Sequence, residues 1–123
     1  MTLTLPYPPT INSYWRHVGP RVLISANGRR YRRAVGDAVL LGIGAGQIAE
    51  EPLTGRLAVL VEAAPPDRRK RDLDNITKAL LDALTHAGVW LDDSQIDDLR
   101  IVRRGPERGG CVVVHVMPIM EAA

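Results

Sequence analysis

The sequence has one cysteine, Cys111, which excludes an internal disulfide and any zinc site built from several cysteines. Such sparing use of cysteine is typical of a reducing compartment, so we expect a cytoplasmic protein. No apolar run approaches the roughly 20 residues that a membrane-spanning helix needs. The first ten residues also lack the basic and apolar segments of an export signal, so we expect neither secretion nor a membrane partner.

Several catalytic signatures are missing as well. The three histidines have no spacing typical of metal ligands, and zinc is therefore not expected. The serines lie in no nucleophile motif, and the chain has no glycine-rich P-loop for nucleotide phosphates. The segment that begins at Asp72 starts like a calcium-binding loop. Thr77 and Ala83, however, stand where that loop requires glycine and glutamate, which excludes an EF-hand.

Acidic residues are absent from residues 1–36, which carry six arginines and a net charge of +6. Residues 37–71 are balanced, whereas residues 72–98 hold seven aspartates against a single basic residue, Lys78. Of the 16 basic residues in the chain, 14 are arginine, the side chain that binds phosphate through two parallel hydrogen bonds. This bias favours a polyanionic partner, although a GC-rich genome would produce the same composition. The aspartates would repel such a partner unless cations lie between them.

The length and the hydrophobic pattern predict one domain over residues 1–123, of ordinary globular composition with 46% hydrophobic residues. We expect an α+β fold in which a mixed β-sheet is covered by two main helices. Strands are predicted at residues 2–5, 21–24, 56–63, 99–104 and 111–117, and residues 105–110 are predicted to join the last two as a hairpin. Helices are predicted at residues 26–47, capped by Ser25, and at residues 72–87, and residues 9–16 are predicted to form a loop.

The helix predicted at residues 72–87 carries the residues that are most suggestive of chemistry. Asp74, Lys78 and Asp82 are four residues apart and therefore lie along one exposed stripe, opposite the apolar face. Asp72 stands at the helix start, and Asp93 follows a short extended segment that lets the chain return beside it. Carboxylate oxygens from Asp72, Asp74 and Asp93 would suit Mg²⁺ or Mn²⁺, which assist phosphodiester cleavage.

Two less specific interpretations account for the same residues. An aspartate at a helix N-terminus is most often a cap. Asp74 and Lys78 also have the spacing of an ordinary ion pair on a helix surface, worth a few tenths of a kcal/mol.

The combined pattern resembles the RusA family of Holliday junction resolvases over essentially the whole chain. The resemblance rests on PDRRKRDLDN at residues 66–75, followed by Lys78, DAL at residues 82–84 and GVWLDDSQ at residues 88–95. The N-terminal PPTINSYWR at residues 8–16 is similar to the opening of that family. Each part alone would be weak, whereas the combination is specific.

The resemblance implies a homodimeric, Mg²⁺-dependent endonuclease that nicks two opposed strands of four-way junction DNA during recombination and repair. Mn²⁺ is the expected substitute ion, and a bacterium, a phage or a prophage is the expected source. Asp72, Asp74 and Asp93 match the catalytic carboxylates that bind the metal, and Lys78 matches the catalytic lysine. The residues expected to contact DNA are Arg16, Arg68, Arg69, Lys70 and Arg71.

Two rival functions remain open at the level of sequence. One is a metal-dependent nuclease for other branched DNA, such as flaps or replication forks, which would use the same residues. The other is a noncatalytic, arginine-rich nucleic-acid-binding protein, in which the aspartates only cap helices and increase solubility. Magnesium-dependent nicking separates the second rival from both nucleases.

Overall fold

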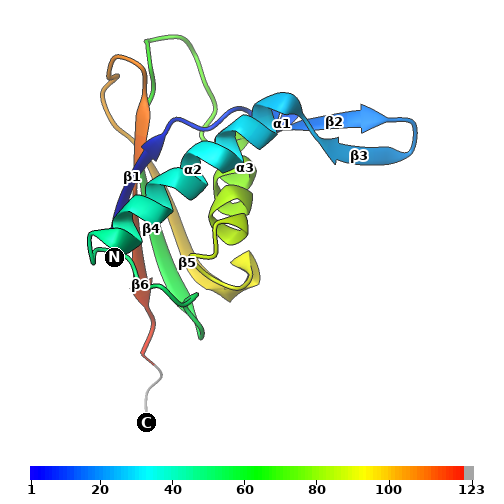
Figure 1. Ribbon diagram of the computed structural model, residues 1–123. Helices are drawn as coiled ribbons and strands as arrows, with labels where there is room; N and C mark the ends of the chain where they lie inside the picture. The colour runs from blue at the N-terminus through cyan, green and yellow to red at the C-terminus, as the bar shows by residue number, and fades with distance from the viewer. Residues whose placement is uncertain (121–123) are drawn as a thin grey trace.

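The computed structural model describes residues 1–120 and shows a four-stranded sheet with two long helices across one of its faces (Figure 1). The elements in chain order are β1 (Thr2–Pro6), α1 (Ile11–Tyr14), β2 (Trp15–Val18), β3 (Arg21–Ile24), α2 (Ala26–Gly44), β4 (Leu57–Ala64), α3 (Asp74–His86), the 3₁₀ turn η1 (Asp93–Gln95), β5 (Ile96–Arg103) and β6 (Cys111–Pro118). The predicted α+β domain with a mixed sheet and two main helices is therefore confirmed, with the short helix α1 in addition. Within residues 1–120, no helix combines the length and the apolar character that crossing a membrane requires.

The strands of the sheet lie in the order β1, β6, β4, β5. Strands β4 and β5 are parallel and are connected through α3, whereas β6 runs antiparallel to both β4 and β1. Along β4 the side chains alternate, so that Leu57, Val59 and Val61 are buried under the helices. The helices contribute Val35, Val39, Ile76, Leu80 and Leu84 to the same core, which explains the apolar stripe predicted for α3.

The hairpin predicted between the last two strands is wrong, because β4 lies between β5 and β6. The connecting residues 104–110 cross the end of β4 instead: the Arg104 amide donates to the Ala63 carbonyl over 2.8 Å, and the Glu107 amide donates to the Pro65 carbonyl over 2.9 Å. The parallel pairing through α3 fixes β5 on one side of β4, and the free side is then filled by β6.

The loop predicted at residues 9–16 is also wrong, because these residues contain α1 and the first half of β2. Strands β2 and β3 form a two-stranded arm that projects away from the sheet (Figure 1). The arm turns at Gly19, whose φ of 60° lies in the left-handed region that glycine adopts without strain. Most of the side chains on β2 are exposed, including Arg16.

Helix α2 begins where predicted, and its first turn fastens α1 to the body of the protein. The Ser25 hydroxyl accepts a hydrogen bond from the Gly28 amide over 2.9 Å and lies 2.9 Å from the Tyr14 carbonyl, to which it donates. The helix ends at Gly44, earlier than predicted, because the chain turns through Gly46 with a φ of 74° and packs Ile48 against Gly42.

Gly28→Ala is expected to destabilise the protein by about 1–3 kcal/mol. A Cβ atom at this position would meet the Tyr14 carbonyl oxygen and would lie 2.6 Å from Cγ1 of Ile24. Gly36→Ala in the same helix is the control: no atom of residues 1–120 lies within 4 Å of its added Cβ, so it should stabilise by up to about 1 kcal/mol. Urea unfolding of both variants checks the difference, and equal midpoints would contradict the close approach at Gly28.

Candidate active site

Two of the predicted carboxylates lie at the N-terminal end of α3. The helix begins at Asp74, two residues later than predicted, and no side chain caps it. Asp72 and Asp74 are both exposed, and within residues 1–120 no hydrogen bond or ion pair engages either carboxylate. The capping interpretation is therefore wrong, and both carboxylates are free to bind another group.

Lys78 lies one turn further along α3 and is exposed. It borders an open, mainly apolar pocket of about 450 Å³ whose other walls come from α1 and the arm, including Trp15 and Val22. None of the ion pairs within residues 1–120 joins Lys78 to Asp74. The alternative of an ordinary surface ion pair is thus not supported, and the ammonium group faces solvent beside the arm.

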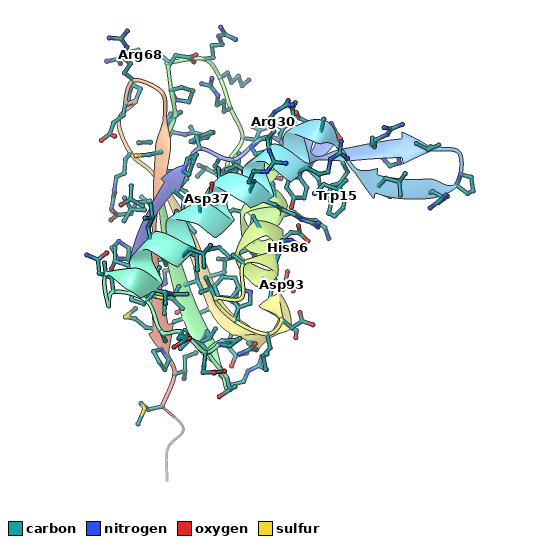
Figure 2. All side chains as sticks on the ribbon, viewed as in Figure 1. Trp15, Arg30, Asp37, Arg68, His86 and Asp93 are labelled. Carbon is teal, nitrogen blue, oxygen red and sulfur yellow. The ribbon has the colours of Figure 1, made fainter. Side chains whose placement is uncertain are left out.

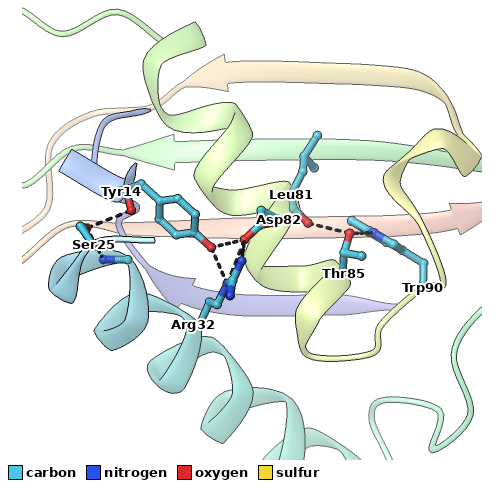
Figure 3. Close-up of polar contacts among 8 residues, drawn as sticks. Tyr14, Ser25, Arg32, Leu81, Asp82, Thr85 and Trp90 are labelled. Atoms are coloured by element: carbon cyan, nitrogen blue, oxygen red, sulfur yellow. Dashed lines mark hydrogen bonds and ion pairs between the residues drawn. The ribbon is translucent and has the colours of Figure 1, made fainter. Parts of the chain in front are cut away.

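Asp93 opens the turn η1, which follows the fully buried Trp90. The Trp90 indole donates to the Thr85 hydroxyl over 2.6 Å and so ties this segment to the end of α3 (Figure 3). Asp92 caps the turn by accepting the Ser94 amide at Oδ1 over 3.0 Å. This contact fixes the Asp92 side chain in the turn, beside the partly buried Asp93.

The charges around Asp93 show which residues lie near it. Partial burial raises the pKa of the Asp93 carboxyl, and Asp92 and Asp82 raise it further, while the Lys78 ammonium opposes the shift. The fold therefore brings Asp93 near Lys78, whereas the sequence suggested a position beside Asp72 at the helix start. Asp72 and Asp74 are not among the groups that act on it, and within residues 1–120 no three acidic, histidine or cysteine side chains converge closely enough to hold a metal ion.

The basic residues after β4 are ordered by one acid, Asp67. Its carboxylate accepts from the Arg71 guanidinium over 2.6 Å and from the Arg69 amide over 2.9 Å, and these contacts lower the pKa of Asp67 to about 2. Arg103 holds the same segment by donating to the Arg71 carbonyl over 2.5 Å. Arg68 and Lys70 are exposed, with no side-chain partner within residues 1–120.

This basic segment, residues 67–71, leads directly to the candidate carboxylates. Lys70, Arg71 and Asp72 line a cleft of about 560 Å³ together with Asn75 of α3. Arg16 lies elsewhere, on the projecting arm (Figure 1). In Figure 2, Arg68 and Asp93 lie far apart, so the predicted DNA-binding residues and carboxylates are not gathered at a single point.

The prediction that Asp82 is an exposed member of the acidic stripe is wrong. Asp82 is half-buried and accepts from the Arg32 guanidinium of α2 over 2.8 Å and from the Tyr14 hydroxyl of α1 (Figure 3). Tyr14 is fully buried, and burial together with the hydrogen bond to Asp82 raises the pKa of its phenol. The only sequence signal for this network was an arginine in the first turns of α2, where basic residues oppose the helix dipole.

The comparisons with known proteins agree over most of the chain. The family model described as Endodeoxyribonuclease RusA matches residues 6–117. A crossover junction endodeoxyribonuclease of Enterobacteria phage 82 is 44% identical over 108 residues, which cover 88% of this chain and 86% of the relative. The protein of that name from Escherichia coli strain K12 is 43% identical over 112 residues, covering 89% and 87%. Its counterpart in Enterobacteria phage HK97 is 45% identical over 113 residues, covering 91% and 89%.

Proposed function

Because the chain belongs to the RusA family of endodeoxyribonucleases, we propose that it resolves four-way DNA junctions by paired, symmetric nicks during recombination and repair. The observation that carries the proposal is the match over residues 6–117, since it includes the carboxylates, Lys78 and the basic segment 67–71. The relatives come from Escherichia coli and from phages, which supports action on chromosomal or phage DNA in the cytoplasm.

The test is cleavage of synthetic DNA under Mg²⁺, with a four-way junction, a replication fork, a flap and a linear duplex of matched sequence as substrates. Preferential, paired nicking of the four-way junction supports the proposal. Equal or faster cleavage of forks or flaps would favour the branched-DNA rival. Tight binding without Mg²⁺-dependent nicking of any substrate would favour the noncatalytic rival.

We propose that Asp72, Asp74 and Asp93 hold the metal, with Mg²⁺ as the expected ion and Mn²⁺ as its substitute. The chemistry of the donors supports this proposal, because hard carboxylate oxygens are the ligands that Mg²⁺ prefers and no protein group within residues 1–120 engages Asp72 or Asp74. The three carboxylates do not converge within residues 1–120, so sharing one ion requires them to come closer together. Carboxylates repel one another, so a cation removes a penalty that otherwise keeps them apart. When bound, the ion supplies Lewis-acid activation of the scissile phosphate.

The side chains around the carboxylates have complementary tasks. The Lys78 ammonium would stabilise the negative charge that develops on the phosphate; in support, it lies near Asp93 and no side chain within residues 1–120 forms an ion pair with it. Arg68 and Lys70 are free to contact backbone phosphates, whereas Arg71 is fixed by Asp67 and shapes the approach to Asp72. Two symmetric cuts require two active sites, so we propose a homodimer whose twofold axis matches that of the junction.

Replacing both Arg68 and Lys70 by alanine is expected to weaken junction binding uniformly across DNA sequences. Each lost phosphate contact should reduce the slope of log affinity against log salt concentration by about 0.9. Fluorescence anisotropy over a range of NaCl concentrations measures the slope. Arg100→Ala, on β5 beside Asp98, is the matched control and should leave the slope unchanged. An unchanged slope in the double variant would mean that these two residues do not contact the backbone.

A further inference from the structure

Lys78 and Asp82 have the spacing that normally produces an ion pair on a helix. They are four residues apart on α3, so their side chains emerge one above the other. Within residues 1–120, however, no ion pair joins them. Some other contact must therefore satisfy Asp82 and prevent it from attracting the nearest cation on its own helix.

That contact comes from α2, which packs beside α3. The Nη2 and Nε atoms of Arg32 lie 2.8 Å and 3.0 Å from Oδ2 of Asp82, so two donors of one guanidinium converge on one carboxylate oxygen. The same Nε lies 2.9 Å from the Tyr14 hydroxyl, and the guanidinium carbon lies 5.9 Å from the centre of the Tyr14 ring. The hydroxyl of Tyr14 also donates to Oδ2 of Asp82 (Figure 3).

The environment favours this arrangement over a pair with Lys78. The side chains of Arg32 and Asp82 are 23% and 29% exposed, and partly buried ion pairs are screened less than exposed ones. The planar guanidinium matches a carboxylate with fixed donors, whereas an ammonium on a flexible stem loses more side-chain freedom for each hydrogen bond. Asp82 is therefore held by Arg32 and Tyr14, and no ion pair within residues 1–120 engages the Lys78 ammonium, which lies near Asp93.

We propose that Arg32 is a positioning residue for the cleavage reaction: by holding Asp82, it keeps the Lys78 ammonium free to meet the scissile phosphate. This inference rests on the proposed function and adds to it, since the side-chain partners of Arg32 within residues 1–120 are Tyr14 and Asp82 and include none of the candidate metal ligands. Tyr14 also belongs to this hydrogen-bond network, because its buried hydroxyl fixes the orientation of the Asp82 carboxylate.

Removing the guanidinium should redirect Lys78. In Arg32→Met, the Asp82 carboxylate keeps only the hydrogen bond from Tyr14 and remains half-buried without a cation. The Lys78 ammonium lies one turn away and is the nearest replacement on α3. Turnover at saturating four-way junction should then fall by about 10-fold to 100-fold, because a small displacement of a catalytic group has effects of this size. Junction affinity should change no more than in the control variant Arg33→Met, which removes an adjacent exposed arginine of α2.

Two double variants separate a positioning role from a structural one. Asp82→Asn added to Arg32→Met removes the competing carboxylate and should restore most of the lost turnover. In a Lys78→Met background, Arg32→Met should cause little further loss, because both changes act through the same ammonium. Single-turnover rates and melting temperatures are measured for every variant. A structural role predicts instead that Asp82→Asn does not restore the turnover lost in Arg32→Met, and that Arg32→Met lowers turnover further in the Lys78→Met background. Either result would overturn the proposal.

A structure provides a readout that does not depend on catalysis. In crystals of Arg32→Met, the Lys78 ammonium should lie within about 4 Å of the Asp82 carboxylate, the usual limit for an ion pair. A Lys78 side chain that stays near Asp93 would overturn the proposal, even if the protein proved to cut another DNA or none. If Arg32→Met does not fold, the single variant Asp82→Asn is the test, because it removes the carboxylate that competes for Lys78. Turnover near the wild-type value supports the positioning role, and a loss of turnover as large as that of Lys78→Met contradicts it.

Discussion

Asp74→Asn is expected to lower junction cleavage by at least about 10³-fold while junction binding survives. The amide keeps the shape of the side chain but loses the negative charge that holds a divalent cation. No group within residues 1–120 binds the Asp74 carboxylate, so the substitution removes no internal contact and the fold should be retained. A neutral amide also repels phosphate less than a carboxylate does, and binding should therefore be equal or tighter.

Cleavage is measured as single-turnover nicking in Mg²⁺ and binding as a gel shift in EDTA. Asp72→Asn should behave in the same way, whereas Asp98→Asn, on β5 beside Arg100, is the matched control and should retain cleavage. Loss of junction binding in both Asp72→Asn and Asp74→Asn would show that these carboxylates support the DNA interface rather than a metal ion. Full cleavage by either variant would remove that residue from the metal site.

Lys78→Met is expected to lower turnover by about 10²-fold to 10³-fold, the usual effect of removing one electrostatic contact to a transition state. The melting temperature should change little, because within residues 1–120 Lys78 forms no ion pair and its side chain is exposed. Methionine preserves the length and the helix propensity of lysine. A loss of folding therefore cannot imitate the loss of turnover.

Lys78→Arg distinguishes charge from shape at this position. The guanidinium keeps the positive charge but spreads it over a wider fork, so partial recovery of turnover is expected. Both variants are compared with wild type on a saturating four-way junction in Mg²⁺, with melting followed in parallel. If Lys78→Met cleaves within about threefold of wild type, the loss of turnover is far smaller than the removal of a transition-state contact would cause. This result would exclude Lys78 from the chemistry.

The elements that the sequence predicts well are those governed by local chemistry. The apolar period of residues 72–87 predicts α3, alternation predicts β4, and Ser25 caps α2 as expected. The neighbours of each strand could not be predicted in this way, because pairing depends on contacts between distant segments. A glycine-rich connection before β6 looked like a hairpin, whereas the parallel crossover through α3 places β4 between the two strands. The strand predicted at residues 99–104 also missed the first residues of β5, because Asp97 and Asp98 are not typical of a strand.

In the candidate site, too, local spacing was predictable from the sequence, whereas contacts between distant segments were not. Asp74 and Lys78 belong to one helix and Asp72 lies just before it, so helical spacing was enough to place the first two on its exposed side. Asp82 has the same spacing but is half-buried in an ion pair rather than exposed. Its partner Arg32 is 50 residues away in sequence and becomes adjacent only when α2 packs against α3. Helical periodicity describes what a side chain faces on its own helix and contains no information about a second helix.

The pairing of β1 with β6 has a consequence for how the protein is made. Thr2 lies opposite His115 in the sheet, so β1 pairs with a strand that is synthesised more than 100 residues later. At roughly 5–20 residues per second, the apolar side chains of β1 wait on the order of 6–20 s for a partner. Such distant pairing also slows folding, since a long loop must close before any hydrogen bond repays its entropy. The nascent chain is thus exposed to aggregation and to chaperones until β6 has been synthesised.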